Sequence, residues 1–269
     1  MKGIILAGGL GKRLYPLTKS ISKHLLPIYN KPMLFYPLAI LMKSNIRDIL
    51  IITKEEDLRD FKNMLGNGID IGINIQYIIQ EKPNGIAESF LLGSEFIKKD
   101  NVILALGDNI FVGDNTVNLI CESCRKVDEG KYSSTIFAYE VDNPKSYGVL
   151  SFDEVGNVES IEEKPINPKS NFCVTGLYIY DNKVIEYAKT LKPSKRNELE
   201  ITDINNIYLR ENKLHVEIVN RGDSWFDVGT FENLFKANVK IRDIVINERK
   251  SVACLEKIAN NKGWIPRKY

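Results

Sequence analysis

KGIILAGGLGKR, residues 2–13, joins a short apolar run to a segment rich in glycine. The run from Lys2 to Ala7 predicts a buried parallel strand, because it leaves no polar face for solvent before glycines end it. Glycines at positions 8, 9 and 11 let the backbone approach a ligand and aim successive N–H groups at it. This stretch therefore predicts a first strand followed by a phosphate-holding loop.

The alternation of strands and helices continues to about residue 110. Strands are predicted at 48–53, 74–79 and 102–106, and helices at 32–43, 54–65 and 86–99. Pro37 should bend the first helix or delay its start. Strands separated by helices of this length favour right-handed βαβ units and a parallel sheet.

After residue 130 the pattern changes to short β-type runs with tight turns. These runs lie at 133–141, 147–151, 157–162 and 172–180, and they predict an antiparallel or mixed lobe. Helices are predicted again at 182–191, 201–212 and 230–247, with a strand at 214–219. We expect one continuous α/β body with a β-rich lobe inserted after the fourth strand.

The composition excludes several classes of protein. Among 269 residues, 37 Lys and Arg balance 35 Asp and Glu, which gives no basic field for nucleic acid or a membrane surface. A hydrophobic content of 43% is typical of a globular chain, and four cysteines are too few for a disulfide scaffold. No signal-peptide core or stretch of roughly 20 apolar residues is present, so we expect a cytoplasmic protein.

The glycine-rich loop fits neither of two common phosphate-binding patterns. A P-loop needs glycine six residues before the lysine and Ser or Thr after it, but Leu6 and Arg13 stand there. A dinucleotide fingerprint needs glycine at position 14, which is Leu14. Lys12, Arg13, Lys19 and Lys23 crowd the loop, which favours a polyanion such as a triphosphate. A glycine-rich turn without a ligand stays open as the alternative.

Two carboxylates are candidates for holding Mg²⁺. Asp108 follows the apolar strand 102–106, at the edge of the sheet where open α/β folds bind ligands. Asp227 lies in SWFDVGT, residues 224–230, and we expect both at strand–turn–helix junctions. Mg²⁺ is typically bound by one or two carboxylates together with phosphates. A turn or a helix N-cap is the structural alternative for either residue.

Other polar residues give weaker indications. Glu163 and Lys164 follow a β-run, where the lysine can hold a phosphate as a point charge, although a solvated strand end is equally compatible. Gln80 follows the third strand, and its amide can pair with the edge of a base or simply close a turn. Cys121 and Cys124 form a CxxC inside a predicted helix, which favours an ordinary helix face over zinc.

Seven segments, in order along almost the whole chain, resemble the glucose-1-phosphate thymidylyltransferases, a branch of the sugar nucleotidyltransferases. The segments are LAGGLGKRLYPLT, SKHLLPIYNKPM, LGDN, EEKP, VTGLYIYD, ELEITDIN and WFDVGT. The resemblance implies an α/β, Rossmann-like fold of the nucleotide-diphospho-sugar transferase type: a mixed, mainly parallel sheet flanked by helices, with an inserted β-rich sugar-binding lobe. It implies a single domain over 1–269, divided into a nucleotide-binding half (1–130), a sugar-phosphate-binding half (131–230) and a C-terminal helical segment (231–269).

The resemblance also implies an activity. The chain would transfer a thymidylyl group from dTTP to α-D-glucose 1-phosphate with Mg²⁺, giving dTDP-glucose and pyrophosphate, the first step toward dTDP-L-rhamnose and other dTDP-deoxysugars. A UTP-using enzyme, another sugar-1-phosphate nucleotidyltransferase and a non-catalytic nucleotide-sugar-binding homologue stay open as alternatives.

Site residues follow from the same resemblance. Arg13, Lys23 and Lys164 would be catalytic, and Asp108 and Asp227 would bind the metal. The nucleotide would lie against Leu6, Gly8, Gly9 and Gly11, with its base at Gln80, Pro83 and Gly85. The sugar phosphate would lie against Asn109, Tyr147, Gly148, Glu163, Lys164 and Val174.

Some positions depart from the family pattern. Lys12 stands where Thr is usual, His24 where Gln is usual, and Asn197 where Gly is usual. We expect a short form that lacks the last C-terminal helical segment, with 251–258 retaining part of a second, feedback nucleotide site. A homo-oligomer, tetramer or dimer, is also expected, with no nucleic acid or membrane as partner.

Overall fold

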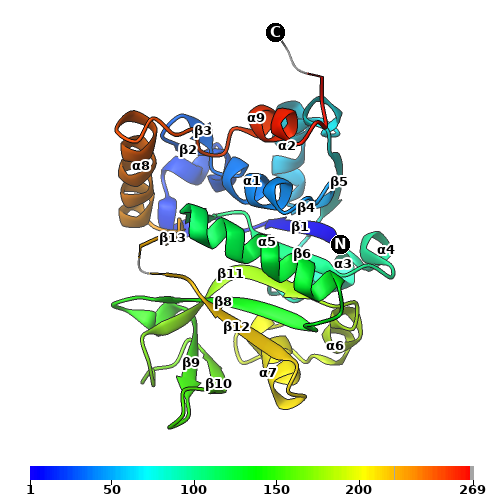
Figure 1. The fold of residues 1–269 in the computed structure, drawn as a ribbon, viewed down its shortest axis with the longest axis vertical. Helices are drawn as coiled ribbons and strands as arrows, with labels where there is room; N and C mark the ends of the chain where they lie inside the picture. The colour runs from blue at the N-terminus through cyan, green and yellow to red at the C-terminus, as the bar shows by residue number, and fades with distance from the viewer. Residues whose placement is uncertain (221, 267–269) are drawn as a thin grey trace. The chain divides into compact units, whose positions relative to one another are not determined.

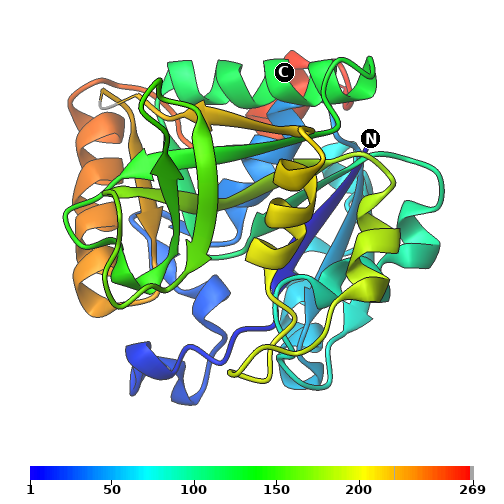
Figure 2. The same cartoon turned by 90° about the horizontal axis from the view of Figure 1, so that it is seen from below.

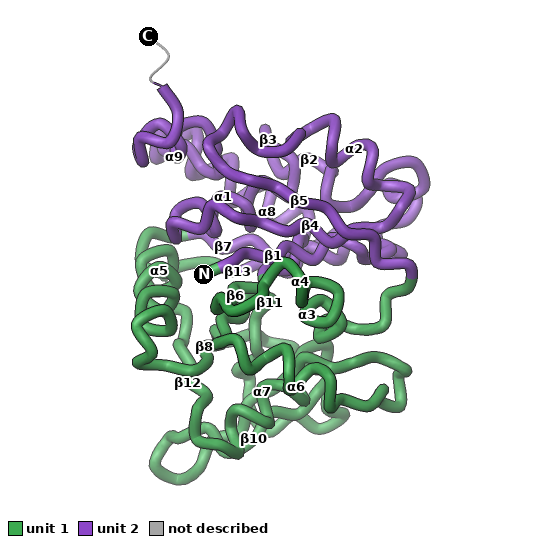
Figure 3. The backbone as a smooth tube through the Cα atoms, turned by 90° about the vertical axis from the view of Figure 1, so that its right-hand side faces the viewer, with its two compact units in different colours: residues 1, 82–104, 113–224 green, residues 2–81, 105–112, 225–269 purple. Residues whose placement is uncertain are grey.

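The computed structural model describes residues 1–220 and 222–266. The chain divides into two compact units (Figure 3). Unit 1 holds residue 1, residues 82–104 and residues 113–224, whereas unit 2 holds residues 2–81, residues 105–112 and the segment from Trp225 onward. Each unit is built from segments that are distant in the sequence.

Unit 2 begins with three parallel strands in the order β1-β4-β5, coloured blue to cyan in Figure 2. They are β1 (Lys2–Ala7), β4 (Asp48–Thr53) and β5 (Asn74–Ile79), as the apolar runs predict. Gly3 pairs with Ile49 and Asp48 with Asn74, so the three strands end at one edge. That edge carries the glycine-rich loop after β1.

The helices of unit 2 cover these strands. They are α1 (Phe35–Lys43), α2 (Glu55–Leu65), α8 (Phe231–Ile246) and α9 (Leu255–Asn261). The prediction that Pro37 delays the first helix is confirmed, since α1 starts at Phe35 and Pro37 lies in its first turn, where the missing N–H costs no helical hydrogen bond. Three acidic residues in the first turn of α2 complement its helix dipole.

Short elements complete unit 2. Two-stranded pairs are formed by β2 (Pro27–Ile28) with β3 (Lys31–Pro32) and by β7 (Asn109–Val112) with β13 (Ser224–Asp227). Single 3₁₀ turns are η1 (Lys12–Leu14), η2 (Leu17–Lys19), η3 (Lys23–Leu25) and η4 (Ile69–Ile71). The expected helix after Asp108 is wrong, because the next four residues, of which three are apolar, form strand β7.

Unit 1 contains the β-rich lobe, visible in green below β11 in Figure 1. Its strands are β8 (Ser134–Glu140), β9 (Gly148–Phe152), β10 (Val158–Glu163), β11 (Phe172–Tyr180) and β12 (Leu214–Ile218). They follow the order β10-β9-β11, with β6 (Val102–Leu106) next to β11. Strand β8 pairs with β11 antiparallel and with β12 parallel, so the predicted mixed lobe is confirmed.

The helices of unit 1 include one correction to the sequence-based prediction. They are α3 (Glu88–Leu92), α4 (Ser94–Ile97), α5 (Asp114–Asp128), α6 (Val184–Thr190) and α7 (Ile201–Arg210), with a 3₁₀ turn η5 (Pro144–Ser146). The single helix predicted over 86–99 is wrong, because Gly93 ends α3 and begins α4. Glycine is a weak helix former, and the break follows from it. Cys121 and Cys124 lie on α5, as expected.

The predicted fold class is confirmed: an α/β protein with a mixed, mainly parallel sheet and flanking helices. Each unit buries its own core, with Ile4, Ile5 and Phe61 in unit 2 and Phe137 and Tyr180 in unit 1. Within the residues that the structure describes, no helix is long and apolar enough to cross a membrane.

Candidate active site

Two hydrogen bonds fix the conformation of the glycine-rich loop of unit 2 at Gly11. Gly11 adopts a left-handed conformation, with φ of 61°, and its carbonyl accepts bonds from Leu14 N and Thr18 Oγ1, both at 2.9 Å. Only glycine adopts this conformation without strain. The loop therefore turns at Gly11 into the 3₁₀ turn that carries Arg13.

Gly8 and Gly9 have ordinary backbone dihedral angles, so their requirement for glycine is steric. A Cβ on Gly8 would lie 2.5 Å from Oε1 of Gln80, and a Cβ on Gly9 would lie 3.1 Å from Nζ of Lys23. The ends of two polar side chains thus occupy the space beside the loop. Gln80 is itself buried at the end of β5.

Lys23 and Asp108 form a buried ion pair under this loop. The ammonium donates to Oδ2 of Asp108, and the two side chains are only 12% and 11% exposed. Burial alone would raise the pKa of Asp108, but the Lys23 charge holds it well below the usual range for Asp. Asp108 is therefore ionised, and the structural alternative of a helix N-cap does not apply.

His24 lies next to this pair and stays neutral. Its ring is fully buried, with Nδ1 at 3.2 Å from Ser22 Oγ. Burial lowers the pKa of His24 to about 3, and the neighbouring Lys23 charge lowers it in the same direction. A Cβ on Gly107 would lie 2.7 Å from His24 Cδ2, so the ring packs against the turn that carries Asp108. His24 therefore supports the pair without adding a charge.

Backbone and amide contacts connect the two candidate metal carboxylates. Val228 N donates to the carbonyl of Asp108 at 2.9 Å, which joins the turn after β6 to the residue after Asp227. Asn109 Nδ2 donates to Asp108 Oδ1 at 3.1 Å, while its Oδ1 accepts from Trp225 Nε1 at 2.7 Å. In the described part of the chain, no group of three or more His, Cys, Asp or Glu gathers as a metal cage.

Unit 1 presents a second cluster at the end of β10. Glu163 lies opposite Gly148, and Lys164 adopts a positive φ of 46°, with its N–H donating to Tyr147 O at 2.9 Å. Lys164 Nζ lies 3.7 Å from Glu163 Oε1. The other predicted residue of this lobe, Val174, is buried in β11.

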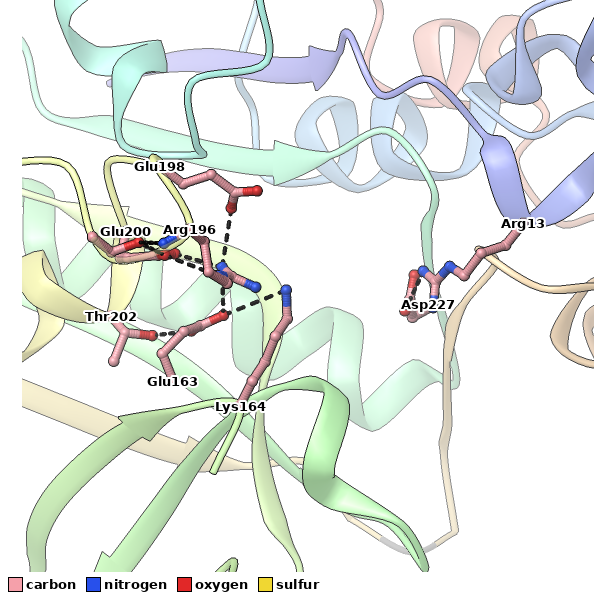
Figure 4. A network of polar contacts seen from close by, with 9 residues as sticks. Arg13, Glu163, Lys164, Arg196, Glu198, Glu200, Thr202 and Asp227 are labelled. Carbon is pink, nitrogen blue, oxygen red and sulfur yellow. Dashed lines mark hydrogen bonds and ion pairs between the residues drawn. The ribbon is translucent and has the colours of Figure 1, made fainter. Parts of the chain in front are cut away.

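Arg196 organises this second cluster, as Figure 4 shows. Its guanidinium contacts three carboxylates: Glu200 at 2.7 Å, Glu198 at 3.0 Å and Glu163 at 3.2 Å. Burial acts to raise the pKa of Glu200, but the hydrogen bonds from Arg196 and Ser194 together with the Arg196 charge outweigh it, so that pKa lies below its usual value. Ser194 Oγ also donates to Glu200, at 2.6 Å.

Sequence reasoning missed Arg196, Glu200 and Thr202. Thr202 Oγ1 donates to Glu163 Oε2 from the first turn of α7. Thr202 and Glu163 stand 39 positions apart, so no local spacing indicates their contact. Arg196 and Glu200 form an i, i+4 pair outside a helix, which resembles any surface ion pair in the sequence.

The loop before α3 is fixed to the segment that follows Arg196. Gly85 has a φ of 110°, and a Cβ there would lie 2.3 Å from Leu199 O. Leu199 N donates to Asn84 O at 2.6 Å, and Ala87 N donates to Leu199 O at 3.2 Å. Glycine is therefore required at position 85 by both conformation and space.

The predicted site residues thus fall into two groups, one in each unit. Unit 2 holds Leu6, Gly8, Gly9, Gly11, Arg13, Lys23, Gln80, Asp108, Asn109 and Asp227. Unit 1 holds Pro83, Gly85, Tyr147, Gly148, Glu163, Lys164 and Val174. The first group combines a glycine loop with cations and carboxylates, and in the second Glu163 and Lys164 lie beside Arg196.

This combination and the comparisons define the enzyme class as a nucleotidyltransferase. The model of the family described as "Nucleotidyl transferase" matches residues 2–244. A chain titled UDP-glucose pyrophosphorylase, complexed with UDP-glucose, shares the fold with a TM-score of 0.78 at 22% identity, covering 90% of this chain and 98% of that one.

Relatives with higher sequence identity indicate the family within this enzyme class. A glucose-1-phosphate thymidylyltransferase of Neisseria meningitidis serogroup A is 50% identical over 98% of this chain and 91% of its own length. A crystal structure with the same enzyme name, from Bacillus anthracis in complex with a sucrose, has a TM-score of 0.83 at 43% identity, covering 91% of this chain and 96% of that one. The chain belongs to the glucose-1-phosphate thymidylyltransferase family of nucleotidyltransferases.

Proposed function

We propose that this chain transfers a thymidylyl group from dTTP to α-D-glucose 1-phosphate, giving dTDP-glucose and pyrophosphate. The observation that carries the reaction class is the buried Lys23–Asp108 pair at the glycine loop, where a polyanion would meet a fixed cation and an ionised carboxylate. The names of the relatives supply the base and the sugar.

Unit 2 would bind the nucleotide. The N–H groups of the loop at Gly8, Gly9 and Gly11 suit phosphate oxygens, and Arg13 and Lys23 supply positive charge. Leu6, in strand β1 just before the loop, would also lie against the nucleotide. The amide of Gln80, held against Gly8, offers a donor and an acceptor to the edge of the base. An amide distinguishes thymine from cytosine or a purine, but not from uracil, because thymine and uracil differ only by a methyl group.

Unit 1 would bind the sugar phosphate. Glu163, oriented by Thr202 and Arg196, can accept hydrogen bonds from sugar hydroxyls. Lys164 and Arg196 provide charge for the phosphate, with the Lys164 backbone fixed by its bond to Tyr147. The roles of Asn109, Gly148 and Val174 as sugar-phosphate ligands stay predictions, as do those of Pro83 and Gly85 toward the base.

The reaction needs no general base. A sugar phosphate has a second pKa of about 6, so it is largely dianionic at neutral pH. One of its oxygens forms a bond to the α-phosphorus of dTTP, and the bond from that phosphorus to the bridging oxygen breaks, so pyrophosphate leaves with the electron pair. The chain's work is to align two polyanions and offset their repulsion. His24, neutral above a pKa of about 3, takes no proton in this step.

The residues present fit Mg²⁺ as the cofactor. Asp108 is ionised, and the bond from Val228 to Asp108 holds the segments of Asp108 and Asp227 together. Two carboxylates with the remaining positions taken by phosphates and water is a usual set for this ion. Asp108 and Asp227 would hold it, and when bound it would offset negative charge on the phosphates.

The test is pyrophosphate release with glucose 1-phosphate, comparing dTTP, UTP, CTP, GTP and ATP, each with and without Mg²⁺. We expect release that depends on Mg²⁺ and is fastest with dTTP. UTP as fast as dTTP would mean that the pocket does not sense the methyl group. No release with any nucleotide, while glucose 1-phosphate and nucleotide both bind, would support a binding protein instead.

Arg13→Ala tests whether the Arg13 charge acts on the reacting phosphates or only binds the substrate. If Arg13 acts on the reacting phosphates, this variant lowers the maximal rate far more than it weakens binding of glucose 1-phosphate. Equal losses in both quantities would make Arg13 an anchor for the bound substrate. The KM for nucleotide, measured in the same experiment, shows whether Arg13 also contributes to nucleotide binding.

A further inference from the structure

Gly229 lies where a side chain would meet Arg13. It stands in WFDVGT, between Asp227 and the N-cap of α8, Thr230. A Cβ on Gly229 would lie 2.4 Å from Nη2 of Arg13 and 3.2 Å from its Cζ. The guanidinium therefore packs directly on the backbone of Gly229.

Backbone conformation does not explain this glycine. Gly229 has no positive φ, unlike Gly11 or Gly85, so alanine can adopt its dihedral angles. A Cβ there would also lie 3.4 Å from Asp227 Oδ1, which is an ordinary contact. The steric conflict of a methyl group at position 229 is thus with Arg13 itself.

The ion pair of Arg13 is too weak to hold the guanidinium by itself. Nη2 lies 4.0 Å from Asp227 Oδ2, and the Arg13 side chain is 60% exposed (Figure 4). An exposed pair at that separation contributes little, about 0–1 kcal/mol at most. The contact with Gly229 therefore adds to this ion pair in restricting where the guanidinium lies. Gly8 and Gly9 make the same kind of contact with Gln80 and Lys23.

We propose that Gly229 is a positioning residue for the reaction: its missing side chain provides the surface on which Arg13 is held beside Asp227. The inference rests on the proposed function, in which Arg13 offsets charge on the reacting phosphates. A methyl group at 229 displaces Nη2 by about 1 Å, since ordinary carbon contacts begin near 3.4 Å. A misplacement of about 1 Å in a catalytic group can lower the rate about 10²-fold.

The test is a double-mutant cycle on pyrophosphate release with Gly229→Ala, Arg13→Ala and the double variant. We expect Gly229→Ala to lower kcat about 10- to 100-fold with the KM for dTTP changed less than threefold. In the Arg13→Ala background the same substitution should change kcat less than twofold, because the group that it displaces is gone. Gly222→Ala is the matched control, since the nearest atom a Cβ would meet among the described residues is Asn220 Oδ1 at 3.8 Å.

Two results would overturn the proposal. One is a kcat of Gly229→Ala within twofold of the wild type. The other is a double variant whose fold-loss in kcat equals the product of the fold-losses of the two single variants, because the two residues would then act independently. Arg13→Lys gives a second readout that needs no change at 229. Lysine keeps the charge but has no planar group to lie on Gly229, so we expect the kcat of Arg13→Lys to fall by most of the factor seen for Arg13→Ala. A fully active Arg13→Lys variant contradicts the role of the surface.

A readout without turnover separates this inference from the proposed function. Phenylglyoxal modifies arginine, and mass spectrometry locates the product at Arg13. We expect the Arg13 guanidinium to be modified at least twofold faster in Gly229→Ala than in the wild type, because one of its faces is no longer covered. An inactive wild type with that increase refutes only the proposed function; an unchanged modification rate refutes the role of Gly229.

Discussion

Lys23→Met should strongly destabilise the fold. It removes the ammonium and leaves the Asp108 carboxylate buried beside a neutral side chain. Both side chains of this pair are nearly nine-tenths buried, so water cannot replace the lost partner. Removing one partner of a buried ion pair typically costs about 3–5 kcal/mol. For a chain of this size that corresponds to a melting temperature lower by roughly 5–9 °C.

The measurement is thermal unfolding at neutral pH without nucleotide or metal, supported by urea unfolding. Lys2→Met is the matched control, because Lys2 Nζ pairs with Asp48 Oδ2 at 2.7 Å, but that carboxylate is 44% exposed. Such a pair contributes about 0–1 kcal/mol. The double variant Lys23→Met with Asp108→Asn should recover part of the loss, since no charge is then buried.

A Lys23→Met variant as stable as Lys2→Met would refute the reasoning. It would mean that Asp108 is not held as a buried charge, and that the pair at the glycine loop is no fixed feature of the unliganded protein. A double variant that is less stable than either single variant would also contradict the reasoning. In that case the two side chains would stabilise the fold through separate contacts.

Further predictions concern the residues around Arg196 and Gly85 in unit 1 and the proposed Mg²⁺. Gly85→Ala should destabilise by about 2 kcal/mol more than Gly156→Ala, because both have positive φ but only Gly85 meets backbone; urea unfolding checks this. Arg196→Met should destabilise by about 1–3 kcal/mol at pH 7. Arg196 helps to lower the pKa of Glu200 from 4.5, so the stability that this pair contributes is present above pH 4.5 and is lost as the pH falls. In acid unfolding curves, the difference in unfolding free energy between the wild type and Arg196→Met should therefore become smaller below pH 4.5. Chelation of divalent metal should abolish pyrophosphate release, and added Mg²⁺ should restore it.

Most of the longer strands were predictable because they are apolar or alternating runs bounded by turn residues. β1, β4, β5 and β11 begin and end where the sequence predicts. The division of 86–99 into two helices was not predicted, because a single glycine inside a helical pattern lowers propensity without fixing a break. Strand β7 was missed for another reason: its partner β13 lies more than a hundred residues later, and a four-residue segment with three apolar residues fits a helix equally well.

In the candidate site too, some residues could be predicted from the sequence, and others could be found only in the fold. Asp108 and the glycine loop could be found because a carboxylate and glycines at strand ends carry a local meaning. The partner of Asp108 could not, since Lys23 is one of several basic residues near the loop and only the fold selects it. Arg196 is similar: its contact with Glu163 joins positions 33 apart, and no period or motif in one sequence indicates it.

The most direct test of the proposed reaction is to determine which product contains ³²P when dTTP is labelled at a known phosphate. With glucose 1-phosphate, Mg²⁺ and [α-³²P]dTTP, thymidylyl transfer predicts that the label appears in dTDP-glucose and not in pyrophosphate. With [γ-³²P]dTTP, the label should appear in pyrophosphate alone. Label from the γ-position in a sugar product would mean phosphoryl transfer, and that result would contradict the proposed reaction.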